Sequence, residues 1–172
     1  MRSEVLFIGG RSGVGKSSLA NELHWRLAAH DVKHAVIEGD NLDQAHPPPW
    51  KVYDLAEKNL SYLWSNYRAL GYRRLIYTNT VSVLQTQALS SAMGDDPLVR
   101  AVLLQASDDV TGSRLAGRES ETTLAAHLER SRQRAVELGR DTPAWVWRVT
   151  TDGKSIPEVA QEILALLVWL PD

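Results

Sequence analysis

The chain has 172 residues, of which 44% are hydrophobic and 23% are charged, a composition typical of one folded domain with a sizeable buried core. Its net charge of −2 excludes the strongly basic surface of a nucleic-acid-binding protein, and the absence of cysteine excludes disulfides and thiolate metal sites. No apolar run approaches the ~18 residues of a membrane span, and the N-terminus lacks a signal-peptide pattern, so we expect one cytoplasmic domain over residues 1–172 without membrane or nucleic-acid partners.

Apolar runs and helical patterns alternate along the chain. In order, we expect a strand at 4–9, a helix at 16–29, a strand at 34–38, a proline-containing turn at 39–49, a helix at 51–70, a strand at 74–78, a helix at 82–93, a strand at 99–105, a helix at 107–117, a long helix ending near 139, a strand at 144–149 and a helix at 157–169. This alternation predicts an α/β fold with a parallel sheet and helices on both of its faces. Right-handed crossovers place the loops that follow the strands at one edge of the sheet, where ligands bind.

The loop between the first strand and the first helix carries the most specific motif. It reads Gly-Arg-Ser-Gly-Val-Gly-Lys-Ser over residues 10–17, which matches the phosphate loop G-x-x-x-x-G-K-[ST] in its strand–loop–helix context. Glycines let backbone N–H groups approach an anion, Lys16 reaches the β- and γ-phosphates, and Ser17 binds Mg²⁺. The alternative is a chance turn with a helix cap, against which the complete match argues. We expect a nucleoside triphosphate to bind Gly10, Arg11, Ser12, Gly13, Val14, Gly15, Lys16, Ser17 and Ser18.

A second polar cluster, Asp40-Asn41, follows the strand at 34–38 and adjoins the phosphate loop in a parallel sheet. Phosphoryl transfer to a hydroxyl needs a carboxylate that orients the hydroxyl, accepts its proton or holds Mg²⁺ through water, and Asp40 suits each role. The alternative is an ordinary strand-ending turn, in which Asp and Asn are common. The strand at 74–78 ends without the carboxylate that many phosphate-loop NTPases carry there, which favours a small-molecule kinase over a motor or a switch.

Two pairs of arginines follow in the second half of the chain. Arg114 and Arg118 are four residues apart, so both guanidinium groups can converge on one anion from a lid over about 114–134. The alternative is a solvated helix face. Arg130 and Arg134 are like charges on one face, and we interpret them as secondary phosphate or substrate contacts.

The remaining candidates are loop residues at the same edge of the sheet. The segment 150–154 contains Thr151 and Asp152, which can either hold a nucleotide base through backbone groups or form a plain Asp-Gly turn. For the pocket that binds the phosphate acceptor we expect Asn41, Asp43, Trp50 and Asn79.

With these motifs, the chain resembles the small phosphate-loop kinases of the nucleoside-monophosphate-kinase-like group. That group includes shikimate, gluconate and adenylyl-sulfate kinases and chloramphenicol phosphotransferase. Residues 10–17 match its nucleotide loop, and the Glu-Gly-Asp-Asn run at 38–41 is similar to the Asp-Gly-Asp-Asn run of adenylyl-sulfate kinases. The Arg-Leu-Ala-Gly-Arg run at 114–118 is similar to the lid arginine pattern of the group.

This resemblance implies a three-layer fold with five parallel strands in the order 2-3-1-4-5, an arginine-bearing lid, ATP as the phosphoryl donor and Mg²⁺ as the metal. It also implies that adenine packs at 150–153. The segment 44–50 has no counterpart in the group, so the resemblance does not identify the acceptor.

The sequence therefore predicts an ATP-dependent phosphotransferase that moves the γ-phosphoryl group to a hydroxyl of a metabolite, a nucleotide-like compound or an antibiotic. Lys16, Asp40, Arg114 and Arg118 would act in catalysis, and Ser17 and Asp40 would hold the Mg²⁺ ion. The alternative function is that of a nucleotide-binding regulatory or resistance protein with slow or no hydrolysis.

Overall fold

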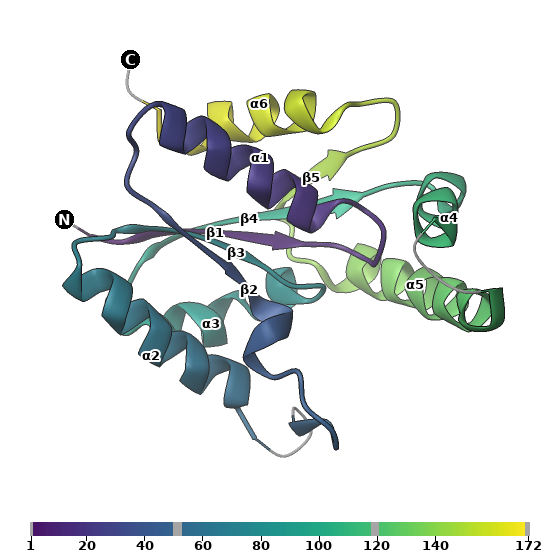
Figure 1. Ribbon diagram of the computed structural model, residues 1–172, viewed down its shortest axis with the longest axis horizontal. Helices are drawn as coiled ribbons and strands as arrows, with labels where there is room; N and C mark the ends of the chain where they lie inside the picture. Colours follow the sequence, from purple (N-terminus) through teal and green to yellow (C-terminus); the bar gives the residue numbers. More distant parts are fainter. Residues whose placement is uncertain (1, 50–52, 118–120, 171–172) are drawn as a thin grey trace.

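The computed structural model of the protein describes residues 2–49, 53–117 and 121–170, and for 121–123 it describes the backbone alone. Strands and helices alternate along the chain (Figure 1). In order, the elements are β1 (Glu4–Gly9), α1 (Lys16–Ala29), β2 (Ala35–Glu38), η1 (Gly39–Leu42), α2 (Leu55–Ala69), β3 (Arg74–Thr78), η3 (Ser82–Leu84), α3 (Thr86–Met93), β4 (Leu98–Gln105), α4 (Asp108–Ala116), α5 (Glu121–Asp141), β5 (Trp147–Thr150) and α6 (Ile156–Leu167).

The five strands form one sheet in the order β2-β3-β1-β4-β5, and every neighbouring pair is parallel. This confirms the predicted α/β class and the strand order that the resemblance implied. Strand β1 lies at the centre, and its residues from Val5 to Ile8 are fully buried. Parallel strands read as continuous apolar runs because helices cover them on both faces.

Helices form one layer on each face of the sheet, and Figure 1 shows α1 and α6 on the side opposite α2 and α3. Alternate side chains of β1 supply the two cores, since successive residues of a strand point to opposite faces. Leu6 and Ile8 pack into the core that includes Leu23 of α1. Phe7 packs into the core that includes Trp64 of α2.

Three expected boundaries differ from the structure for local reasons. The last strand begins at Trp147 rather than at 144, because α5 continues to Asp141 and the Val146 N–H donates to the Pro143 carbonyl in a turn (3.1 Å). The single helix expected at 82–93 is instead a 3-10 turn, η3, followed by α3. The helix expected from residue 51 is described from Leu55 onward.

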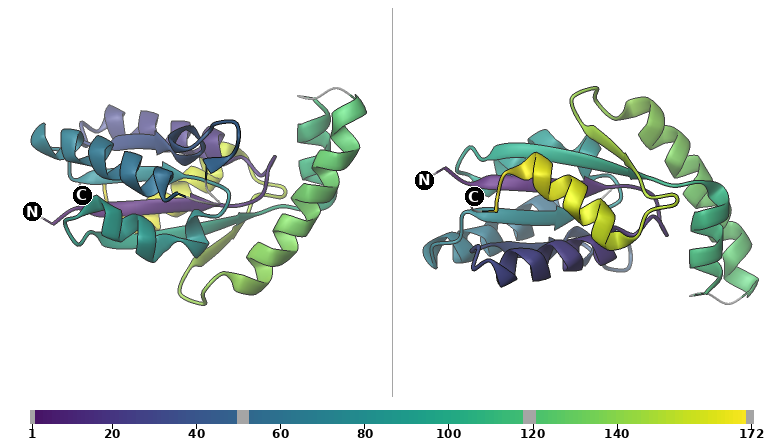
Figure 2. Two further views of the ribbon diagram at one scale, coloured as in Figure 1. Left: turned by 90° about the horizontal axis from the view of Figure 1, so that it is seen from below. Right: turned by 90° about the horizontal axis from the view of Figure 1, so that it is seen from above.

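The ends of the parallel strands bring the predicted loops to one edge of the sheet. Figure 2 shows α4 and α5 extending beyond this edge, on the side away from the two chain termini. Among the described residues, every helix is too short or too polar to cross a bilayer.

Candidate active site

The phosphate loop, residues 10–17, connects β1 to α1 through a backbone that requires glycine. Gly10 has a φ of +147° and Gly13 a φ of +81°, which L side chains rarely adopt. A Cβ on Gly10 would lie 2.8 Å from the carbonyl oxygen of Leu104, and a Cβ on Gly13 would lie 3.1 Å from that of Thr111. Glycine at both positions therefore lets the loop pass close to β4 and α4.

The loop leaves a set of backbone donors without acceptors. Within the part of the chain that the structure describes, no acceptor bonds the N–H groups of Gly13, Gly15, Lys16 and Ser17. Helix α1 begins at Lys16, and no side chain caps its N-terminus. The positive end of the helix dipole therefore lies at the phosphate loop as well. Unpaired N–H groups at a helix N-terminus form a site for an anion, and several groups in sequence fit a polyphosphate.

Lys16 adds a cation to this site. Its Nζ atom donates to the carbonyl oxygens of Gly10 (2.8 Å) and Arg11 (3.2 Å), so the side chain folds back across the loop. Burial lowers the pKa of Lys16, and the nearby carboxylates of Asp40 and Glu38 oppose that shift. A polyanion bound in the loop could replace these two carbonyl oxygens as acceptors for the Lys16 ammonium group.

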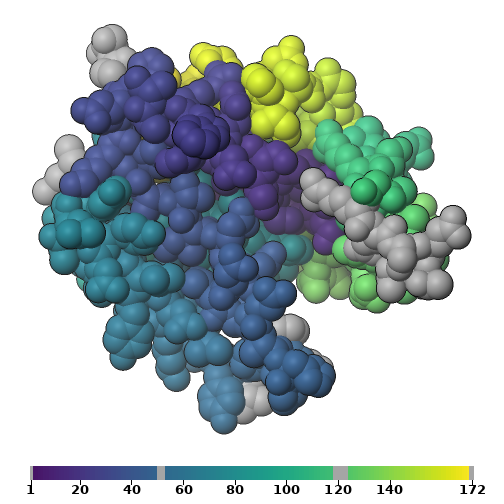
Figure 3. Space-filling model, in the orientation of Figure 1, coloured from purple at the N-terminus to yellow at the C-terminus, as the bar shows by residue number. Residues whose placement is uncertain are grey.

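A cavity of about 460 Å³ opens on the loop and collects most of the predicted nucleotide residues. In Figure 3 the purple surface of the N-terminal residues is exposed between the yellow C-terminal residues and the green residues of α4 and α5. Arg114 of α4 reaches it, and its Nη1 atom donates to the Val14 carbonyl oxygen (3.2 Å). The lining consists of Ser12, Gly13, Gly15, Lys16, Ser17, Ser18, Arg114, Leu115, His127 and Ile156.

The Arg11 side chain points away from this cavity and anchors the loop to α4. It is only 4% exposed, and its Nη1 atom forms an ion pair with Asp108 (2.5 Å). Its Nη2 atom donates to the Thr111 hydroxyl and to the Ala106 carbonyl oxygen (3.2 Å). The hydrogen bond from Arg11 holds the pKa of Asp108 below its usual range. Arg11 was predicted among the nucleotide-binding residues of the loop; its side chain contacts Asp108, Thr111 and the Ala106 carbonyl oxygen and does not line the cavity.

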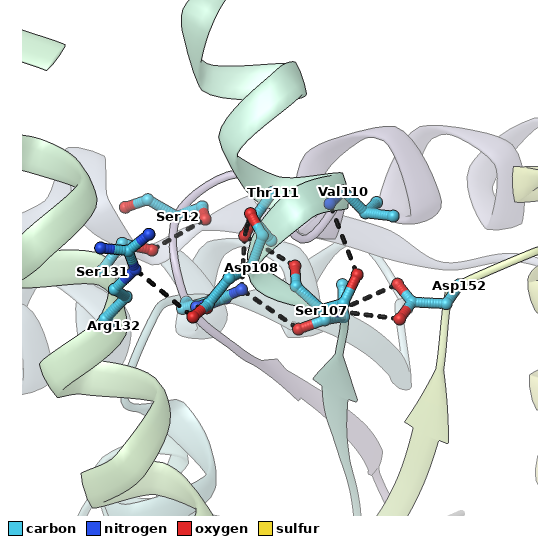
Figure 4. Close-up of polar contacts among 10 residues, drawn as sticks. Ser12, Ser107, Asp108, Val110, Thr111, Ser131, Arg132 and Asp152 are labelled. Atoms are coloured by element: carbon cyan, nitrogen blue, oxygen red, sulfur yellow. Dashed lines mark hydrogen bonds and ion pairs between the residues drawn. The ribbon is translucent and has the colours of Figure 1, made fainter. Parts of the chain in front are cut away.

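Helix α5 contacts the same network, as Figure 4 shows. Arg132 places its Nε atom 3.3 Å from Asp108, and the Ser131 hydroxyl donates to the Ser12 carbonyl oxygen (3.3 Å). Asp152, in the loop after β5, accepts two hydrogen bonds from the Ser107 N–H (2.9 and 3.1 Å). Four separate chain segments are thereby tied together around the phosphate loop.

A second cavity, of about 700 Å³, lies beside the end of β2 and is called here the acid-lined cavity. It contains Asp40, whose Oδ1 atom accepts a hydrogen bond from the Asn79 side-chain amide (2.7 Å). Burial and the neighbouring carboxylates of Asp40 and Glu57 raise the pKa of Asp43. The lining consists of Asp40, Asp43, Tyr53, Asp54, Ala56, Glu57, Tyr77, Asn79, Thr80, Val81, Leu84, Gln85 and Arg134.

Tyr77 forms the inner wall of the acid-lined cavity. Its side chain is 1% exposed, and its ring packs edge-on against Phe7 at a centroid distance of 5.6 Å. The hydroxyl lies against Gly39, where a Cβ would be only 2.3 Å from the Tyr77 oxygen. Glycine at position 39 therefore lets the end of β2, and with it Asp40, approach this ring closely.

The structure brings together some predicted residues and separates others. Asp40, Asp43, Asn79 and Arg134 share the acid-lined cavity, whereas Asn41 and Arg130 line neither cavity. Thr151 is buried and donates its N–H to the Gln105 carbonyl oxygen (2.8 Å), and it and Asp152 also line neither cavity. Trp50 and Arg118 lie outside the described residues.

Several lining residues were missed in the sequence. His127 and Ile156 border the phosphate loop from α5 and α6, and no local pattern marks either of them. Tyr53, Asp54 and Glu57 border the acid-lined cavity. Asp54 and Glu57, at the start of α2, could have indicated a polar site from the sequence. Acidic residues are also common at a helix N-terminus because they interact favourably with the helix dipole, so they did not stand out.

Comparison with known proteins agrees with this geometry. A model of the family "Adenylylsulphate kinase" matches residues 2–46, which carry the phosphate loop and Asp40 but amount to less than half of the chain. No curated protein sequence matches the chain.

Solved structures match nearly the whole chain at low sequence identity. The tunicamycin resistance protein of Deinococcus radiodurans superposes with a TM-score of 0.67 at 23% identity, covering 96% of each chain. The APS kinase of Mycobacterium tuberculosis, solved with AMPPNP and APS, has a TM-score of 0.62 at 23% identity over 97% of this chain and 98% of that chain. A gluconokinase of Sinorhizobium meliloti has a TM-score of 0.59 at 18% identity over 98% and 94%. The chain thus has the fold of the small phosphate-loop kinases.

The contact between Gly39 and Tyr77 predicts an effect on stability. We expect Gly39→Ala to destabilise the protein by about 1–3 kcal/mol, because the added methyl group overlaps the Tyr77 hydroxyl and the Thr78 carbonyl oxygen. Urea unfolding measures the change. Gly139→Ala, on α5 with open space around it, is the control and should be neutral or stabilising. Equal stability of Gly39→Ala and the unmodified protein would contradict the packing described.

The anchor of the phosphate loop predicts a second effect. Asp108→Ala leaves the buried Arg11 guanidinium without its carboxylate, and since Asp108 itself is about half exposed we expect a loss of about 1–2 kcal/mol. Thermal unfolding at neutral pH measures it. Asp109→Ala, the neighbouring exposed carboxylate, is the matched control and should change stability little. If both variants lost the same stability, the Arg11–Asp108 pair would not be the anchor.

Proposed function

We propose that the protein is a kinase that transfers the γ-phosphoryl group of ATP to a hydroxyl group of a small molecule. The observation that carries the proposal is the pairing of two cavities at one sheet edge. One exposes unpaired amides, Lys16 and Arg114, and the other exposes the carboxylate of Asp40. Lys16 lines the first cavity and Asp40 the second, and the Asp40 carboxylate is close enough to raise the pKa of Lys16 against the effect of burial.

The phosphate loop would hold the triphosphate of ATP. The free N–H groups from Gly13 to Ser17 bind its oxygens, and Lys16 exchanges the loop carbonyls for the β- and γ-phosphates. Arg114, which already borders the loop, would balance the charge that develops on the transferred group. In this proposal α4 and α5 form the lid over about 114–134, with Arg118 as a second arginine, and the loop at Thr151 and Asp152 adjoins the base.

The residues beside the loop fit a magnesium ion. The Ser17 hydroxyl and the Asp40 carboxylate are hard oxygen donors, which Mg²⁺ prefers, and Ser17 is exposed at the first turn of α1. Among the described residues no group of three His, Asp or Glu side chains is placed to hold a metal ion. The ion would supply charge neutralisation on the phosphates.

Asp40 would act on the acceptor. Its Oδ1 atom is fixed by the Asn79 amide, so the carboxylate has one defined orientation toward the cavity. The acceptor hydroxyl oxygen bonds to the γ-phosphorus, the bond from that phosphorus to the β–γ bridging oxygen breaks, and the hydroxyl proton passes to Asp40. The products are ADP and a phosphate monoester.

A second candidate follows from the tunicamycin resistance protein, which has the highest TM-score of the structures described above. In that function the chain would bind a toxic natural product next to the nucleotide without transferring a phosphoryl group. Mass spectrometry of the small molecule after incubation with ATP separates the two candidates, because only a kinase adds a phosphate.

Two substitutions test the kinase proposal directly. We expect Lys16→Ala and Asp40→Asn each to lower acceptor-dependent ADP release by about two or more orders of magnitude, the scale of losing a key charge or a general base. Asp40→Asn should still bind ATP in calorimetry. The matched controls are Lys33→Ala and Asp31→Asn, exposed residues of the turn before β2 at the opposite edge of the sheet. Full activity of Asp40→Asn would refute the role of this carboxylate.

The environment of Lys16 predicts a pH dependence of nucleotide binding. The pKa of Lys16 is lowered in the free protein, and a bound polyanion favours the charged form and raises it. At a pH between the Lys16 pKa of the free protein and that of the complex, ATP binding takes up a proton, so the affinity for ATP should fall as the pH rises. Because the pKa in the free protein is lowered, this fall should begin at a lower pH than it would for an ordinary lysine. Calorimetry in two buffers of different ionisation enthalpy measures the uptake. Lys16→Met should abolish it, and uptake that persists in this variant would assign it to another group.

A further inference from the structure

The charges that line the acid-lined cavity are almost all negative. Four carboxylates border it, those of Asp40, Asp43, Asp54 and Glu57. The lining contains one cationic side chain, Arg134, and its Nη1 atom is already paired with Glu137 at 2.6 Å. The described lining therefore offers no unpaired cation to a ligand.

Three of the four carboxylates have no role in the proposed transfer. Asp40 faces Lys16 and the proposed metal, but Asp43, Asp54 and Glu57 belong to the segments from η1 to the first turn of α2. None of these three forms an ion pair with a side chain of the described residues. Burial raises the pKa of Asp43, and repulsion by the carboxylates of Asp40 and Glu57 adds to that shift. A positive charge inside the cavity would remove this repulsion.

Tyr77 supplies an independent indication of a ligand. Its side chain is almost completely buried at the inner wall of the cavity, yet its hydroxyl makes no hydrogen bond to any described residue. Because Tyr77 lines the cavity, a ligand atom there can form a hydrogen bond with this hydroxyl. Burial and the nearby carboxylates raise the pKa of Tyr77 well above its usual range, so the hydroxyl keeps its proton and can donate. A ligand group that bonds to it would be an acceptor such as a hydroxyl oxygen.

The size of the acid-lined cavity indicates the size of its ligand. At about 700 Å³ it falls in the range of sites that enclose drug-sized ligands, which is larger than a single small alcohol needs. Tyr53 at its mouth is 63% exposed and offers an aromatic face to a ring or to a cation.

We propose that the phosphate acceptor is a polyhydroxylated amine, with its ammonium group in the part of the cavity lined by Asp43, Asp54 and Glu57 and its reacting hydroxyl beside Asp40 and Tyr77. This inference rests on the proposed kinase function. In the transfer, a hydroxyl oxygen of the amine bonds to the γ-phosphorus of ATP, its proton passes to Asp40, and ADP leaves, while the ammonium group keeps its charge. Carboxylate, phosphate or sulfate groups are repelled by the same three side chains.

The test compares acceptors that differ in charge on one carbon skeleton. Glucosamine, glucose and glucuronate form one such set, and aminocyclitol glycosides and their N-acetylated derivatives form a larger one. Gluconate and adenylyl sulfate serve as further anionic probes. Product formation with ATP and Mg²⁺ is followed by mass spectrometry and ADP release. We expect kcat/KM for the free amine to exceed that of the neutral and acidic partners by about tenfold or more, the scale of one charge–charge contact.

Variants locate the effect in the cavity. Asp43→Asn, Asp54→Asn and Glu57→Gln should each raise KM for the amine about tenfold and KM for the N-acetylated acceptor much less, so each variant narrows the preference for the amine. Glu57→Lys should shift the preference toward acids. Asp31→Asn, which removes an exposed carboxylate in the turn before β2, is the control. A merely structural role of the three residues would lower activity toward all acceptors alike, and that result would overturn the proposal.

Binding separates this inference from the kinase proposal. The same acceptors are titrated by calorimetry into protein saturated with a non-hydrolysable ATP analogue. If amines bind with the charge dependence described but no phosphate is transferred, the inference holds and the kinase function fails. If an acid or a neutral analogue is phosphorylated in preference to its amine partner, the kinase function holds and the inference fails. If no amine binds, the inference also fails.

Discussion

The candidate site depends on a loop in which several backbone N–H groups, those of Gly13, Gly15, Lys16 and Ser17, have no acceptor among the described residues. Such a loop has to be held in place by its side chains and by its neighbours. Arg11 does this with a buried guanidinium group that reaches Asp108, Thr111 and the Ala106 carbonyl oxygen. Since that side chain points away from the cavity, the face of the loop toward the solvent consists of amides and Lys16. The anchoring network and the anion site are therefore two sides of the same eight residues.

The two cavities have opposite electrostatic character, and this difference organises the chemistry. Amides, Lys16 and Arg114 surround the first, while carboxylates surround the second. In the proposed reaction the negatively charged phosphoryl donor would be attracted to the first cavity and repelled by the second. Asp40 lies close enough to Lys16 to affect its pKa, and the Asn79 amide fixes the orientation of the Asp40 carboxylate. Charge would thus sort the two proposed reactants between the cavities.

The sequence predicted the parts of this site that have local signatures. The phosphate loop is a contiguous motif, and Asp40 and Asn79 follow apolar strands whose parallel pairing brings them together, so all three were accessible without a structure. The role of Arg11 was not, because its partners lie about a hundred positions away and depend on how α4 packs. The cavity residues of α2 were missed for a related reason. Acids at the start of a helix are common, and only the fold places these beside Asp40.

The family match covers the segment that carries the most specific local sequence signatures. The adenylylsulphate kinase model matches residues 2–46, where the loop and Asp40 lie, and the rest of the chain keeps the fold at low identity to the kinases compared above. Most of the acid-lined cavity comes from beyond residue 46, from 53–57, 77–85 and 134. In the proposed kinase the first cavity would hold a triphosphate, which needs the amides and the lysine of the matched segment. The acceptor would bind in the acid-lined cavity, so its identity cannot be inferred from a match that ends before most of that cavity begins.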